Sequence, residues 1–200
     1  MSDRRATRGD RRFDGVVLLL AMVVAMWALE IVDELAAGSP LDAYGIEPRD
    51  PDGLPAIVSA PFLHVGFGHL IGNTIPFVAM GVVIALQGVV RLALVTAIVV
   101  LVSGLGVWLV GPDNSIHLGA SGIVFGYATY LLARGIFNRA LFEIVVGVAV
   151  AVIWGTALVG GLVPQEGVSW QGHLFGAIGG VVAARVLARR REREREPASP

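Results

Sequence analysis

The segment "HLGASGIVFGY", residues 117–127, combines the apolar character of a membrane helix with several small and polar residues. It lies within an 18-residue window, 116–133, that contains no Asp, Glu, Lys or Arg, as expected of a helix that enters a lipid bilayer. The front of this window nevertheless carries His117, Ser121 and three glycines. Polar side chains within a membrane are costly and usually face the interior of a helix bundle. We therefore expect this helix to present functional groups to other helices.

Composition extends this interpretation to the whole chain. The 200 residues are 55% hydrophobic and 16% charged, with a mean hydropathy of +0.73. A soluble domain has about a quarter charged residues. The composition therefore predicts an all-α, polytopic membrane protein. The absence of cysteine excludes disulfides and Cys-ligated metal sites.

Six membrane-spanning helices are predicted from the apolar runs. They lie at about 16–35, 70–90, 92–110, 118–133, 144–163 and 169–187. Each is close to the ~20 residues that cross a bilayer. The first run is interpreted as a retained helix and not as a cleaved signal peptide, because five further spans follow it. The domain limits are then a basic N-terminal segment (1–14), a six-helix domain (15–189) and a charged, disordered tail (190–200).

The arginines predict the orientation. All fifteen basic residues are arginine, and fourteen of them fall on one side if the N-terminus is cytoplasmic, which leaves only Arg49 outside. Basic residues concentrate in cytoplasmic segments of membrane proteins. We therefore expect both termini in the cytoplasm. Because Arg, Ala, Val and Gly dominate the composition, as in GC-rich bacterial genomes, we expect a multi-pass protein of a bacterial cell membrane.

With this orientation the second, fourth and sixth helices enter from the outside, so their first turns lie at one depth. The second begins "HLIGN" (69–73), the fourth "HLGASG" (117–122) and the sixth "SWQGHLFG" (169–176). His69 and Asn73 are four residues apart and share a helix face. Small residues in the fourth and sixth helices, including Gly176, allow two backbones to approach closely in lipid.

Close approach would bring Ser121 within hydrogen-bond reach of His173. A serine hydroxyl becomes a good nucleophile when a neighbouring imidazole takes its proton. No Asp or Glu lies near His173, so the sequence predicts a two-residue dyad whose imidazole is oriented by packing, with Phe125 placed to stack on it. The Ser121 amide at a helix start and the side chains of Asn73 and His69 are the expected oxyanion donors.

The segments "HVGFGHLIGN" (64–73), "GASG" (119–122) and "GHLFG" (172–176) together resemble the rhomboid family of intramembrane serine proteases. The resemblance covers about 16–187, with 48 residues from Asn73 to Ser121 and 52 more to His173. It implies a six-helix core with Ser121 as nucleophile and His173 as general base.

The same resemblance assigns supporting residues. Asn73 and His69 would line the oxyanion hole, and His64 matches the first histidine of the family's helix-two motif. Gly119 and Gly122 match the glycines that flank the serine. Some bacterial members have a tyrosine at the position of Phe125. A phenyl ring can still stack but offers no hydroxyl.

The function implied is an endopeptidase that cuts in or near the outer part of substrate membrane helices. Its partners would be single-span or polytopic membrane proteins and the bilayer, with no nucleic acid, no cofactor and no metal. One alternative is a catalytically silent rhomboid-like binding or quality-control protein, which would be marked by loss of the serine or the histidine. Another is a metal transporter that uses His64, His69 and His173. The sequence leaves open the substrate, the oligomeric state, the fold between the first two helices and the roles of His64 and His117.

Overall fold

A computed structural model describes residues 8–36 and 38–188 as a bundle of α-helices without a strand in those ranges. The helices are α1 (Arg8–Leu35), α2 (Ala56–Ser59), α3 (Gly66–Ala85), α4 (Val89–Val110), α5 (Ser121–Asn138), α6 (Leu141–Gly161) and α7 (Trp170–Val186). Three short 3-10 helices, η1 (Pro40–Tyr44), η2 (Pro51–Gly53) and η3 (Ala60–Phe62), lie between α1 and α3. The predicted all-helical fold is confirmed, whereas the tail predicted at 190–200 lies outside the described residues.

Four helices, α1, α3, α4 and α6, are long and apolar enough to cross a membrane. The glycine-rich α5 and α7 do not meet the same criterion, and α7 has only 17 residues. The count of six membrane crossings and the orientation of the termini therefore stay predictions.

Several predicted helix ends differ from the observed ones. α1 begins at Arg8, so the second half of the basic N-terminal segment is helical. The helix expected at 118–133 runs from Ser121 to Asn138. It starts later because Gly119 has φ +108, a conformation that a helix cannot contain. It ends where Arg139 takes a left-handed conformation, as helix C-caps often do.

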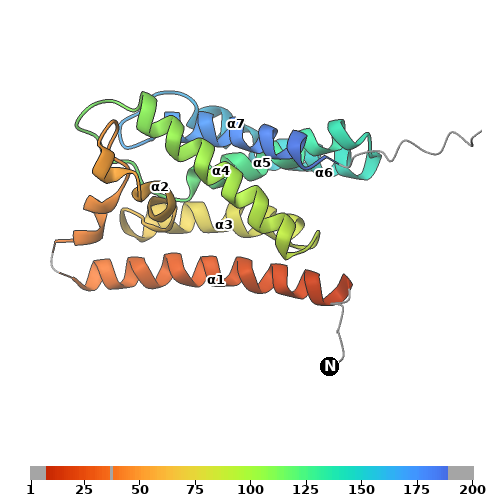
Figure 1. The fold of residues 1–200 in the computed structure, drawn as a ribbon, viewed down its shortest axis with the longest axis horizontal. Coiled ribbons are helices and arrows are strands. Elements are labelled where there is room, and N and C mark those ends of the chain that lie inside the picture. The colour runs from red at the N-terminus through yellow and green to blue at the C-terminus, as the bar shows by residue number, and fades with distance from the viewer. Residues whose placement is uncertain (1–7, 37, 189–200) are drawn as a thin grey trace, which may run out of the picture.

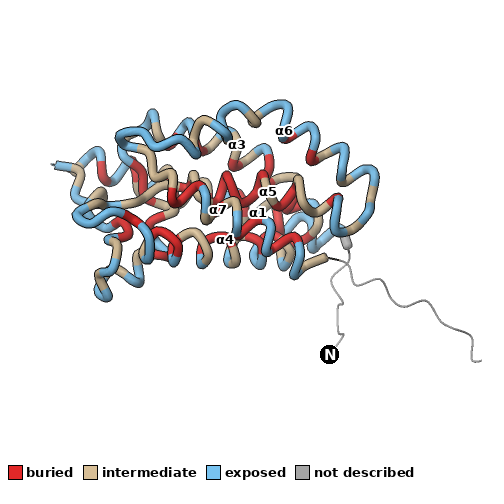
Figure 2. Tube along the Cα trace, turned by 90° about the horizontal axis from the view of Figure 1, so that it is seen from above, coloured by how far each residue is buried: buried red, intermediate tan, exposed pale blue. Residues whose placement is uncertain are grey.

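Helices α5 and α7 form the centre of the bundle. α7 packs against both α5 and α4, and α3 contacts α1 (Figure 1). α6 packs mainly on α5 and lies along one edge of the bundle (Figure 2). The buried residues concentrate in the central helices, while most of α6 is exposed (Figure 2). The exposed side chains of α6 are largely apolar, for example Val152 and Ile153, as expected of a surface that faces lipid.

Glycines bring α5 and α7 into close contact. A methyl group on Gly176 would overlap the carbonyl group of Gly122, and one on Gly180 would overlap that of Gly126. Backbones that touch in this way require small residues at the crossing. The predicted close approach of these two helices is confirmed, and it fixes the relative position of their first turns.

The segment between α1 and α3, whose fold the sequence left open, covers the end of the bundle at which α5 begins. Asp33 of α1 accepts a hydrogen bond from the Leu41 amide (2.6 Å). Ile46 exchanges two backbone hydrogen bonds with His117 (2.8 and 3.0 Å), and Ala60 accepts one from the Gly119 amide (2.9 Å). The segment therefore holds the loop that leads into α5.

Candidate active site

The loop before α5 presents Ser121 at the first position of that helix. Gly119 has φ +108, and a β-carbon there would lie only 2.6 Å from Cε1 of His69. Glycine is the residue that accepts both this conformation and this close contact. The next amide, of Ala120, donates a hydrogen bond to Nε2 of His64 (3.3 Å). These contacts fix the backbone directly before the serine.

His64 is a buried positioning group in this arrangement. Its side chain is 2% exposed, and it lies before α3, outside the long helices. Burial, and to a lesser degree the neighbouring His69, lowers the pKa of His64 to about 4. The ring is therefore neutral near pH 7. Because Nε2 accepts the Ala120 amide, the single ring proton belongs on Nδ1.

Ser121 and His173 meet where α5 and α7 begin. Oγ of Ser121 lies 2.8 Å from Nε2 of His173. Nδ1 of the same ring lies 2.6 Å from the carbonyl oxygen of Gly161. A carbonyl oxygen only accepts hydrogen bonds, so Nδ1 carries the proton. Nε2 of the neutral ring is then an acceptor, and the serine hydroxyl donates to it.

The His173 ring is held on two sides. Phe125 stacks on it with the ring centroids 4.1 Å apart and the planes inclined by 4°. Gly161 touches both rings: a β-carbon at this residue would lie 2.7 Å from Cζ of Phe125 and 3.0 Å from Nδ1 of His173. Packing by Phe125 was expected from the sequence.

The role of Gly161 was not expected. Gly161 is the last residue of α6. The last carbonyl groups of a helix accept no hydrogen bond from within the helix, and they lie at the negative end of its dipole. A backbone carbonyl therefore supplies the orienting hydrogen bond that an acidic side chain supplies in a three-residue triad. In the sequence, the feature that marks this position is the pair Gly160–Gly161 near the end of a predicted span. That pair gives no indication of a contact with His173.

Two hydrogen-bond donors, the Asn73 side chain and the Ser121 amide, lie at or near the loop that leads into α5. Asn73 is 6% exposed, and its Nδ2 atom is buried without a hydrogen-bond partner among the described residues. A β-carbon on Gly119 would lie 3.6 Å from this atom, so the amide lies beside the loop that leads to Ser121. The Ser121 amide, at the first helical position, has no acceptor within α5. An unpaired buried donor costs about 1–3 kcal/mol, which points to an acceptor that arrives with a ligand.

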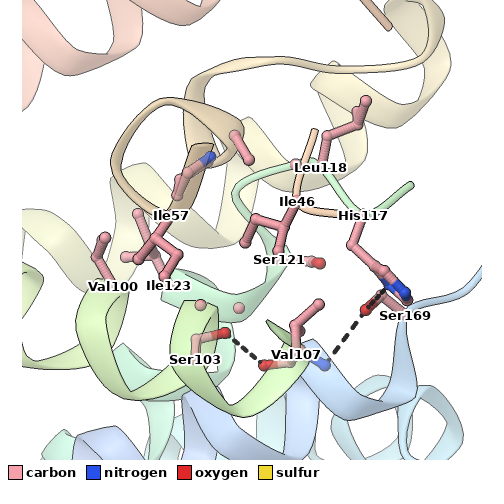
Figure 3. A pocket seen from close by; sticks show the side chains of 16 residues that line it. Ile46, Ile57, Val100, Ser103, Val107, His117, Leu118, Ser121, Ile123 and Ser169 are labelled. Atoms are coloured by element: carbon pink, nitrogen blue, oxygen red, sulfur yellow. Dashed lines mark hydrogen bonds between the residues drawn. The ribbon is translucent and has the colours of Figure 1, made fainter. Parts of the chain in front are cut away.

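A small cavity of about 40 Å³ lies beside Ser121 (Figure 3). Its walls are mainly apolar and include Ile46, Ile57, Val100 and Val107. A volume of this size holds a water molecule or a small side chain. The polar side of the cavity includes Ser103, whose hydroxyl donates to the Gly172 carbonyl (2.9 Å).

His117 has contacts that the sequence did not indicate. Its ring is hydrogen-bonded to the hydroxyl groups of Ser115 (2.8 Å) and Ser169 (2.7 Å). Ser169 is the N-cap of α7, where it accepts the Gly172 amide. Burial lowers the pKa of His117, which lies in the loop before α5. It links this loop to the start of the helix that carries His173, a structural role that the sequence left open.

Comparison with known proteins gives a consistent result. The family model for the Rhomboid domain matches residues 52–190. The uncharacterized protein Rv1337 of Mycobacterium tuberculosis (strain ATCC 25618 / H37Rv) is 41% identical over 192 residues, which is 92% of this chain and 80% of that protein. The uncharacterized protein ML1171 of Mycobacterium leprae (strain TN) is 40% identical over 87% of this chain and 72% of its own. A more distant relative, named "Putative rhomboid protease YdcA", from Bacillus subtilis (strain 168), is 25% identical over 68% of this chain and 69% of its own.

Proposed function

Because the chain belongs to the rhomboid family and is a multi-pass membrane protein, we propose that it is an intramembrane serine endopeptidase that uses Ser121 and His173. The observation that supports this most directly is the 2.8 Å contact between Ser121 Oγ and His173 Nε2, made by residues 52 positions apart. The proton arrangement on the imidazole is the one that a general base needs.

The proposed reaction begins with attack of Ser121 Oγ on the carbonyl carbon of the scissile bond, while Nε2 of His173 takes the hydroxyl proton. The imidazolium that forms keeps its Nδ1–H bonded to the Gly161 carbonyl. The negative oxygen of the tetrahedral intermediate accepts hydrogen bonds from the Asn73 amide, the Ser121 backbone N–H and His69.

Collapse of this intermediate breaks the C–N bond, and His173 gives its proton to the leaving amine. Water then attacks the acyl-enzyme, with Nε2 of His173 again taking the proton. Release of the new carboxyl group restores the serine hydroxyl.

The proposal includes a topology. Six helices would cross a cell membrane with both termini in the cytoplasm, so the starts of α3, α5 and α7 would lie below the outer surface. Substrates would be single-span or polytopic membrane proteins. A substrate helix hides its carbonyl groups in its own hydrogen bonds, so it must unwind before Ser121 can attack. The small cavity beside the serine supports a preference for a small side chain at the cleaved bond.

Two alternatives have less support. A silent rhomboid-like binding protein would be expected to lack the serine or the histidine, and this chain has both. A metal transporter would need converging ligands. Among the residues that the structure describes, no group of three or more His, Asp or Glu side chains is arranged to hold a metal ion.

The proposal is tested by labelling the purified protein with a fluorophosphonate and by measuring cleavage of a membrane-helix substrate in liposomes. Wild type should be labelled and active, and Ser121→Ala should be neither. Ser103→Ala is the matched control, because it removes a hydroxyl that lines the same cavity and bonds to a backbone carbonyl. It should keep its labelling. Equal labelling of Ser121→Ala and wild type, or a folded wild type with no cleavage of any membrane-helix substrate, would contradict the proposal.

A further inference from the structure

A second and larger cavity lies at the other end of the bundle from Ser121. Its volume is about 540 Å³, within the 300–1,000 Å³ range typical of small-molecule sites. It is enclosed by the start of α1, the turn between α3 and α4, the end of α5 and the start of α6. Figure 1 shows these four segments together at the end of the molecule where α1 begins.

The lining of this cavity carries an excess of positive charge. Among the described residues that line it are four arginines, which are Arg11, Arg12, Arg91 and Arg134, and one carboxylate, that of Glu143. Of these four described arginines, Arg134 forms the ion pair with that carboxylate, at 2.6 Å. Arg91 donates to the carbonyl of Leu187 (2.5 Å), a contact that fixes the side chain and leaves its charge unneutralised.

Arg11 and Arg12 are exposed on the first turns of α1. Within the part of the chain that the structure describes, neither of them forms an ion pair. Guanidinium groups that converge in this way are suited to phosphate, because their planar donors match two phosphate oxygens at once.

Apart from Gln87, Gly88 and Asn138, the rest of the lining is apolar, and part of it is exposed. Phe142 at the start of α6 is 78% exposed and Leu86 at the end of α3 is 49% exposed. Val83 and Val146 continue the apolar surface along the two helices. A soluble anion would gain nothing from these side chains. A molecule with a phosphate group and hydrocarbon chains would contact both parts.

Other arginines at this end of the molecule do not line the cavity. Arg139, at the end of α5, is exposed and does not line the cavity. Arg185 of α7 lies over the Phe137 ring, outside the cavity. Arginines thus occur around this end of the molecule, but four of them are gathered in one hollow.

We propose that this cavity binds the phosphate group of an anionic phospholipid, with Arg11, Arg12 and Arg91 around the headgroup and the acyl chains against Phe142 and Leu86. A lipid bound there would connect the start of α1 to the start of α6 across the cavity. Basic pockets between membrane helices are known to hold such headgroups.

Native mass spectrometry of the purified full chain in detergent tests this proposal. Phosphatidylglycerol and phosphatidylcholine with identical acyl chains are added, and the bound fractions are compared. Wild type should bind phosphatidylglycerol preferentially. The variant Arg11→Gln/Arg12→Gln changes two exposed side chains that make no ion pair, so it should fold and should bind this lipid roughly 25-fold more weakly, about fivefold for each arginine.

The matched control is Arg139→Gln/Arg185→Gln, which removes the same charge from the same end of the molecule and leaves the cavity intact. It should bind phosphatidylglycerol within about twofold of wild type. Phosphatidylglycerol should also raise the Tm of wild type and of this control more than that of Arg11→Gln/Arg12→Gln. Inorganic phosphate serves as the free-anion probe and should compete only weakly, since it lacks the apolar contacts.

Three results would overturn the proposal. Equal binding of the two lipids by wild type would remove the selectivity for anionic headgroups. An equal loss in the two double variants would show a diffuse charge effect without a defined site. Competition by inorganic phosphate at the concentration of the lipid itself would show an anion site in which the acyl chains have no part.

Discussion

Replacement of Gly161 by alanine tests the part of the site that only the structure reveals. The added β-carbon would lie 2.7 Å from Cζ of Phe125 and 3.0 Å from Nδ1 of His173, whereas ordinary contacts begin near 3.4 Å. The two rings must therefore move away from residue 161 by about 0.7 and 0.4 Å. Because the rings are stacked, a shift of Phe125 displaces the imidazole as well.

The displacement weakens two hydrogen bonds at once, from Nδ1 to the Gly161 carbonyl (2.6 Å) and between Nε2 and Ser121 Oγ (2.8 Å). A misplacement of about 1 Å costs up to roughly 10²-fold in rate. We therefore expect kcat to fall by roughly 10- to 100-fold, equivalent to about 1.4–2.7 kcal/mol of activation free energy. KM should change little, since Gly161 contacts the catalytic imidazole and is not among the residues that line the cavity beside Ser121.

The assay is cleavage of one membrane-helix substrate in liposomes, together with the rate of fluorophosphonate labelling of Ser121. Both rates should fall by a similar factor. Gly160→Ala is the matched control, because it lies on the same helix turn and its β-carbon would have no atom within 4 Å. It should keep wild-type activity and gain up to about 1 kcal/mol in stability from better helix propensity. If Gly161→Ala cleaves within twofold of Gly160→Ala, the Gly161 contact does not orient the base.

Four further outcomes are expected. Ser121→Ala and His173→Ala should each abolish cleavage, and the double variant should be no worse than either, since half a dyad is no better than none; proteolysis by purified Ser121→Ala would contradict the assignment. Asn73→Ala should lower kcat by roughly 10²–10³ if its unpaired amide binds the oxyanion, and an unchanged kcat would remove it from that role. Removal of residues 192–200 should leave activity nearly intact, and a reporter at the C-terminus should read cytoplasmic; a reading on the outer side would overturn the proposed orientation. Replacing the helix-breaking residues of a cleaved substrate with leucine, while the residues at the cut are kept, should slow cleavage steeply, because unwinding leaves buried polar groups unpaired; equal cleavage of an all-leucine span would show that unwinding is not limiting.

The amino-acid sequence predicts the all-helical class of fold and singles out Ser121 and His173 as the proposed dyad. Long apolar runs predict helices because lipid offers no hydrogen-bond partner to the backbone, so each segment must satisfy its own groups. The family motifs then place Ser121 and His173 near the starts of two helices that run in the same direction. Glycines along both helices indicate close packing, because in lipid only small residues let two backbones touch.

The contacts that hold the site become visible in the three-dimensional structure and not in the sequence. Every residue carries a backbone carbonyl, so no sequence pattern singles out that of Gly161 as the partner of His173. The start of α5 at Ser121 depends on hydrogen bonds from Gly119 to Ala60 and from Ala120 to His64, both contributed by the irregular segment before α3. The link from His117 to Ser169 likewise joins residues that no periodicity relates. Helices in lipid follow from local composition, whereas the orientation of Ser121 and His173 depends on contacts between segments distant in sequence.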